Sequence, residues 1–159
     1  MKKLINYSLL FVVAVLSISC SKDSSSPSLV GKWGFTADGA KGTGSTIVWT
    51  PNSANVCDLQ SYTEFVSNGT LSYQGYTTNP ITGVCELYVD PTPTSSSETW
   101  VRSGDDLVIT FTDFTVTPSN VDTYKSHIVS LTDSELIIQD YDQTTQTNLT
   151  DRYSKLSRR

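Results

Sequence analysis

Phe65-Val66-Ser67-Asn68-Gly69-Thr70-Leu71 carries a strong β-hairpin signal. Asn-Gly readily adopts the positive φ angles of a type I′ turn, and apolar residues stand on both sides of it. The stretch therefore predicts a β-hairpin whose two strands meet at a two-residue turn.

Short runs of strand-forming residues continue in both directions from this hairpin. Leu107, Ile109 and Phe111 alternate with polar or smaller residues, as a half-buried strand requires, and no window of the chain beyond residue 28 has a convincing helical period. The apolar parity shifts after Asp113, which predicts a β-bulge there. We expect about eight strands, some of them split, within residues 29–37, 45–50, 58–66, 70–77, 84–89, 97–103, 106–117, 121–131, 135–141 and 149–156.

The order of these strands favours a closed antiparallel sheet. Strands that follow each other in sequence usually pair in space, and closing such a meander into a barrel removes its exposed edges. The predicted fold class is therefore all-β, an up-and-down antiparallel β-barrel of about eight strands.

The N-terminal segment has the layout of an export signal. Lys2 and Lys3 precede an apolar run, Leu9 to Leu16, which is shorter than the roughly 20 residues that span a bilayer. Cys20 then resembles the lipidated Cys of a bacterial lipoprotein, although Ser17 stands where Leu is commonest. We expect a signal peptide at 1–19, a lipidated Cys and Ser-rich tether at 20–28, and one domain at 29–159. The alternative is an ordinary cleaved signal peptide.

The predicted processing also determines charge and compartment. Removing Lys2 and Lys3 takes the formal net charge from −5 to −7, which argues against nucleic acid as a partner and against adhesion to anionic lipid through a basic face. Acyl chains on Cys20 would anchor the protein to the membrane, and Ser21 is compatible with transfer to the outer membrane. We therefore expect a lipid-anchored protein of the cell envelope.

Two cysteines remain after Cys20 is assigned to the lipid. An even number of cysteines in an exported protein favours a disulfide between Cys57 and Cys85, with a metal site or a reactive thiol as alternatives. A metal site would need more ligands, and His127 is the sole histidine. No nucleophile–base pair is visible, so we expect no metal, no cofactor and no enzyme activity.

The start of the domain resembles a known family. Leu29-Val30-Gly31-Lys32-Trp33 looks like the Gly-x-Trp opening strand of lipocalins, and the later hairpins follow in the order found in bacterial lipocalin-like domain lipoproteins, which are calycin-type β-barrels. The resemblance implies that Trp33 closes one end of the barrel and that Arg152, from the last strand, packs over it. It also implies an interior cavity for a small apolar ligand.

Aromatic residues are the candidates for ligand contacts. About half of the residues on barrel strands face inward, and simple core packing is the alternative role for each. A second hypothesis is a solid barrel that binds a protein or glycan through loops 37–45, 51–56, 77–83 and 90–97. The residues predicted to contact a ligand are Tyr62, Tyr73, Trp100, Phe111 and Tyr124.

Overall fold

The computed structural model describes residues 27–52, 55–89 and 96–159. The predicted signal peptide, Cys20 and most of the tether lie outside these residues. The described part forms a short 3₁₀-helix, η1 (Asp58–Gln60), and the strands β1 (Gly31–Lys41), β2 (Ile47–Pro51), β3 (Tyr62–Phe65), β4 (Thr70–Gln74), β5 (Tyr76–Thr78), β6 (Cys85–Leu87), β7 (Ser96–Ser103), β8 (Asp106–Asp113), β9 (Asn120–Leu131), β10 (Glu135–Tyr141) and β11 (Leu149–Arg158).

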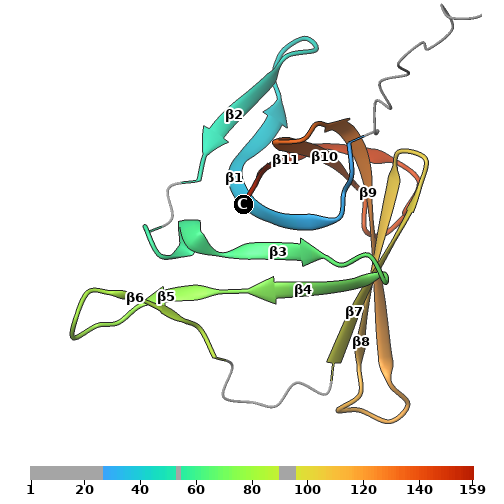
Figure 1. Cartoon of the computed structure of the whole chain (residues 1–159). Coiled ribbons are helices and arrows are strands. Elements are labelled where there is room, and N and C mark those ends of the chain that lie inside the picture. Colours follow the sequence, from blue (N-terminus) through green and yellow to red (C-terminus); the bar gives the residue numbers. More distant parts are fainter. Residues whose placement is uncertain (1–26, 53–54, 90–95) are drawn as a thin grey trace, which may run out of the picture.

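Eight of these strands close into an antiparallel barrel (Figure 1). Going round the wall the order is β1, β3, β4, β7, β8, β9, β10 and β11, and β11 pairs again with β1. Apart from the segments inserted between them, neighbours in sequence are neighbours in the wall, which confirms the predicted up-and-down barrel. The thinnest seam lies between β4 and β7, which share two residue pairs.

One side of the barrel wall is divided. The first half of β1 pairs with β3, whereas its second half, beyond a bulge near Thr36, pairs with β2. Residues 55–61, which precede β3, do not belong to the wall and include η1, so the strand predicted over 58–66 begins only at Tyr62. The physical reason is the bend of β1, which separates the two partners along its length.

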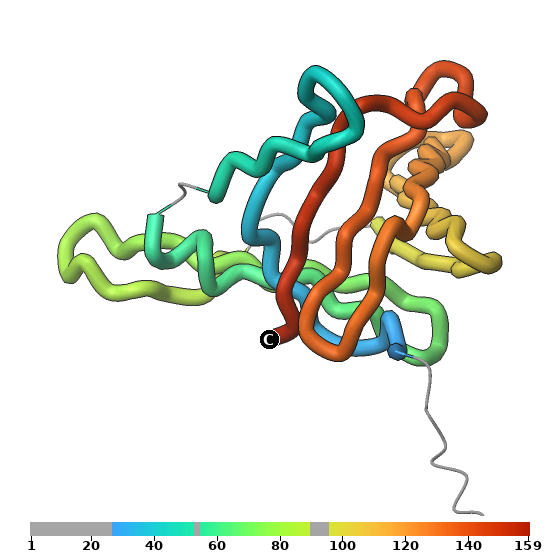
Figure 2. Tube along the Cα trace, turned by 90° about the horizontal axis from the view of Figure 1, so that it is seen from above, coloured from blue at the N-terminus to red at the C-terminus, as the bar shows by residue number. Residues whose placement is uncertain are grey.

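A two-stranded ribbon projects from the same side. β5 continues the direction of β4 but pairs with β6 instead of lying beside β2. We call residues 76–88 the arm, and Figure 2 shows it extending sideways from the barrel. The wall is therefore closed near the start of β1 and open between β2 and the arm.

Two local predictions need correction. At the β3–β4 hairpin, Gly69 has a φ of 86° but Asn68 is not among the residues with positive φ, and Gly69 N–H donates to the Val66 carbonyl. The turn is thus a longer one with a single left-handed residue, not type I′. The strand predicted over 106–117 ends at Asp113 without a bulge, because the Asp113 carboxylate accepts bonds from Thr115 and competes with the ladder.

Candidate functional site

The end of the barrel around Trp33 is filled by side chains. Trp33, Leu107 and Leu136 are fully buried, and the Trp33 indole N–H donates to the Leu29 carbonyl at 2.7 Å. The other buried members of this cluster are Leu29, Phe65, Leu71 and Ile128. Side chains from most strands of the wall meet here, so this end has a packed core.

Arg158 covers the filled end. Its guanidinium carbon lies 4.4 Å from the centre of the Trp33 ring, and its nitrogens donate to the backbone carbonyls of Ser28, Val30 and Asp133. These bonds connect the start of the domain, the turn between β9 and β10, and the last strand, β11. Arg158 therefore closes the barrel as a cation over the indole and as a bridge between three segments.

The prediction that Arg152 closes the barrel is consequently wrong. In the β1–β11 register Trp33 is opposite Arg158, while Arg152 is opposite Ala40. Six residues along β11 separate the two arginines, which is about 20 Å at the rise of a strand. Both arginines occupy the same face of β11, and only the register with β1 decides which one meets the indole.

Two of the five aromatic candidates are committed to other contacts. Trp100 packs edge-on against Phe65 with ring centres 5.4 Å apart, and its indole N–H donates to the Val66 carbonyl. Tyr62 accepts a hydrogen bond from Lys32 Nζ, which also lies 4.5 Å from its ring centre. The register places Tyr62 on the face opposite to Trp33, outside the barrel.

The other three candidates share the inner face of their strands. Tyr73 pairs with Thr63, which pairs with Trp33; Tyr124 pairs with Ile109, and Phe111 is two residues further along β8. Tyr73 and Tyr124 are nevertheless 66% and 44% exposed, and Phe111 is half-buried. A ligand role for these three stays a prediction.

A hollow of about 390 Å³ lies at the opposite, open end of the barrel. On β11, the side chains of Ser154 and Arg152 lie on the same face as that of the core residue Leu156. The pairing of β1 with β11 places Asp38 opposite Ser154. The hollow is therefore on the inner face of the wall, beyond the packed core. Its lining residues are Asp38, Gly39, Ala40, Thr50, Asp140, Arg152, Tyr153 and Ser154.

The charged groups of the hollow influence one another. Burial raises the pKa of Asp140, and the neighbouring carboxylate of Asp38 acts in the same direction. The Ser126 hydroxyl, 3.3 Å from Asp140, and the charge of Arg152 oppose this shift. Asp140 is thus a half-buried acid whose ionised form is disfavoured by its surroundings.

Sequence reasoning missed this site. Neither Asp38 nor Asp140 is among the residues predicted to contact a ligand, and Arg152 is expected at the other end of the barrel. Asp140 and Arg152 lie on the consecutive, paired strands β10 and β11, but Asp38 lies on β1, and only the pairing of β1 with β11 brings it to the other two. The one available signal for an inward position of Arg152 was its even spacing from the apolar residue Leu156, which places both side chains on the same face of the strand.

A second polar cluster occupies the outside of the barrel. The Asp106 carboxylate lies 2.8 Å from Lys125 Nζ and 3.5 Å from His127 Nδ1, and accepts a bond from the Tyr141 hydroxyl at 3.0 Å. The hydrogen bond from Lys125 is the main reason why the pKa of Asp106 lies below its ordinary value. Lys125 also lies over the Tyr141 ring. The cluster is a hydrogen-bonded ion-pair network that joins β8, β9 and β10.

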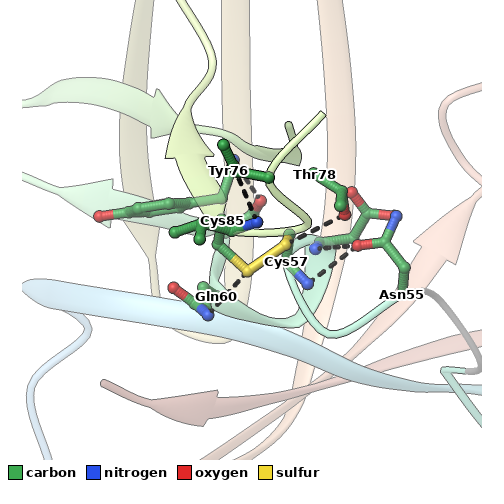
Figure 3. Close-up of a disulfide and its surroundings, with 10 residues drawn as sticks. Asn55, Cys57, Gln60, Tyr76, Thr78 and Cys85 are labelled. Atoms are coloured by element: carbon green, nitrogen blue, oxygen red, sulfur yellow. Dashed lines mark hydrogen bonds between the residues drawn. A yellow bond between two sulfur atoms is a disulfide. The ribbon is translucent and has the colours of Figure 1, made fainter. Parts of the chain in front are cut away.

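The predicted disulfide between Cys57 and Cys85 is present (Figure 3). It joins the segment 55–61, which leads into β3, to β6 of the arm. Gln60 donates to the Cys85 sulfur, Thr78 donates to the Cys57 sulfur, and the Asn55 side chain accepts from the Cys57 amide. The bond thus tethers the arm where the wall itself is open.

The described residues contain no group of three or more His, Cys, Asp or Glu side chains that could hold a metal ion. Within the same residues, no helix is long and apolar enough to cross a membrane.

A family model described as a lipocalin-like domain matches residues 29–138. Comparison with curated proteins and with solved structures gives no match.

Proposed function

Because the chain belongs to the lipocalin-like domain family, we propose that it is a non-catalytic binding protein that takes a small ligand at the open end of its barrel. The observation that carries this proposal is the hollow of about 390 Å³ beyond the packed core. Small-molecule sites in proteins are concave and begin at about 300 Å³, so the hollow has the size of such a site.

The lining of the hollow also narrows the chemistry of the ligand. The resemblance implied a small apolar ligand inside the barrel, but the Trp33 end is filled and the hollow is bordered by Asp38, Asp140 and Arg152. Desolvating charged groups against an apolar surface is costly unless they are paired. We therefore propose a ligand that presents at least one polar or charged group to these residues.

We propose that this binding protein is located in the cell envelope. Acyl chains on Cys20 would anchor it to the outer membrane, and a Ser-rich tether would connect this anchor to the barrel. This location is supported by the order of basic start, apolar run, Cys and Ser-rich segment in the sequence. Mass spectrometry of the protein purified from membranes tests it directly. An unmodified Cys20, or a chain that is cleaved after it, would remove the anchor from the proposal.

Native mass spectrometry of the full chain, purified in mild detergent, tests ligand binding. We expect a co-purified small molecule that is lost when Ala40→Trp fills the hollow and retained in Lys41→Trp, since the neighbouring side chain points to the other face of β1. Retention of the same molecule in Ala40→Trp would place its site elsewhere. Absence of any bound molecule, together with no response to added small molecules, would refute the proposal.

A second candidate function is supported by the arm. Its apolar side chains are unusually exposed, with Ile81 at 93% and Val84 at 59%, and Leu87 and Tyr88 are also exposed. Such surfaces often contact partner proteins. A photo-crosslinking residue at Ile81 tests this in intact cells, with Thr110 on the outer barrel wall as the control position. Equal crosslinking from both positions would argue against a role of the arm.

A further inference from the structure

Three charged side chains meet in the hollow without satisfying one another. Among the described residues, neither the Asp38 carboxylate nor the Arg152 guanidinium makes a hydrogen bond or an ion pair, although both line the same space as Asp140. The outer cluster differs sharply, since there Lys125, His127 and Tyr141 surround one carboxylate. The acid on the outer wall is thus paired with a cation. In the hollow, Asp140 accepts a hydrogen bond from Ser126, and the exposed residues Asp38 and Arg152 have no side-chain partner within the described part of the chain.

We propose that the hollow binds its ligand through a primary ammonium group held between Asp38 and Asp140. This inference rests on the proposed function, because it names the ligand chemistry of the same site. An ammonium group has three N–H donors, and the two carboxylates are acceptors only, so their hydrogen-bonding capacities match. Charge-assisted bonds of this kind are about twice as strong as neutral ones.

The balance of charge selects this ligand class over the alternatives. Two carboxylates against one guanidinium give the hollow a net negative charge when all three are ionised, so an anionic ligand meets more repulsion than attraction. A cation would relieve the repulsion between Asp38 and Asp140, which contributes to the raised pKa of Asp140. Arg152 remains available to a hydrogen-bond acceptor elsewhere on the same ligand.

The experiment compares three probes that share one alkyl chain: hexylammonium, hexanoate and hexanol. Two-dimensional NMR spectra of the full chain in lipid nanodiscs report on the amides of Gly39, Ala40 and Ser154, which line the hollow. We expect hexylammonium to shift these resonances and to bind about tenfold more tightly than hexanoate, because one charge-assisted bond is worth about that factor.

Substitutions identify the groups responsible. Asp38→Asn and Asp140→Asn should each weaken hexylammonium binding about tenfold, since each keeps the shape and removes the charge. Asp151→Asn is the matched control, because this exposed neighbour of Arg152 alternates to the other face of β11. Unchanged affinity in both hollow variants, or an equal loss in the control, would overturn the inference.

The outcomes also separate the two proposals. If hexanoate or hexanol binds as tightly as hexylammonium, the hollow is a binding site but ammonium recognition is wrong. If none of the three probes shifts the resonances of the hollow, ammonium recognition is refuted and the proposed binding function at this site fails with it.

Discussion

Replacing Arg158 by Met tests how the barrel is closed. The substitution keeps an unbranched side chain over the Trp33 ring but removes the cation and every side-chain donor. The variant therefore loses the contact at 4.4 Å from the ring centre and three hydrogen bonds, to Ser28, Val30 and Asp133. Leu29 O still accepts from the indole, so the core beneath is left intact.

The magnitude follows from these contacts. Hydrogen bonds contribute about 0.5–1.5 kcal/mol each, and solvent exposure places these three at the low end. A cation over an aromatic ring at a partly exposed site adds about 0.5–1 kcal/mol. The expected loss in the free energy of unfolding is about 2–2.5 kcal/mol, which corresponds to a fall in Tm of roughly 6–10 °C for a domain of this size.

Thermal unfolding followed by near-ultraviolet circular dichroism measures this loss, and Arg152→Met is the control on the same face of the same strand. Because Arg152 makes no side-chain hydrogen bond within the described part of the chain, its replacement should cost less than about 1 kcal/mol. Equal losses in the two variants, or a larger loss for Arg152→Met, would refute the assignment of Arg158 as the closing residue.

Three further predictions concern the disulfide and two acids. Replacing Cys57 and Cys85 by Ala should lower the free energy of unfolding in urea by about 3.5 kcal/mol, because their sequence separation of 28 sets the loop entropy; an unchanged midpoint would contradict this. Because the pKa of Asp106 is lowered, its ionised form stabilises the fold above pH 3.8, and this contribution is lost as pH falls through the lowered pKa. In a plot of the free energy of unfolding against pH, Asp106→Asn should therefore reduce the slope on the acid side. A plot parallel to that of the wild type would contradict this prediction. The raised pKa of Asp140 acts in the opposite direction, because the stability of the fold decreases as pH rises from 3.8 through the raised pKa. Asp140→Asn should therefore increase the free energy of unfolding by about a few tenths of a kcal/mol at neutral pH, measured by thermal unfolding, and should have no effect below pH 3.8. A gain of equal size at both pH values would exclude deprotonation as its cause.

Features with a local cause were predictable from the sequence. Glu135 to Tyr141 forms β10 over the predicted residues, because its apolar run is bounded by turn residues on both sides. The Cys57–Cys85 bond was also predicted, since the expected lipidation of Cys20 leaves two of the three cysteines and these allow a single pairing. Leu107, Ile109 and Phe111 lie on one face of β8, as their alternation indicated.

Features that depend on pairing between distant strands were not predictable. The bulge near Thr36 shifts the register of β1 and β11 and bends β1 between two partners. That bend opens the wall and leaves a hollow beyond the core. Two strands separated by a loop were predicted in residues 45–66, but not that the second begins only at Tyr62 or that the two pair with different halves of β1.

Local patterns predicted an antiparallel β-barrel and its approximate strand segments. The resemblance to lipocalins pointed to Trp33 as the residue at one end, and the cysteine count favoured the Cys57–Cys85 pair. The pairing of strands in three dimensions places Arg158 rather than Arg152 over Trp33, and it puts Arg152 in the lining of the same hollow as Asp38 and Asp140. The physical reason is that alternation assigns a side chain to a face of its own strand, whereas the register between strands far apart in sequence decides which side chains on that face meet.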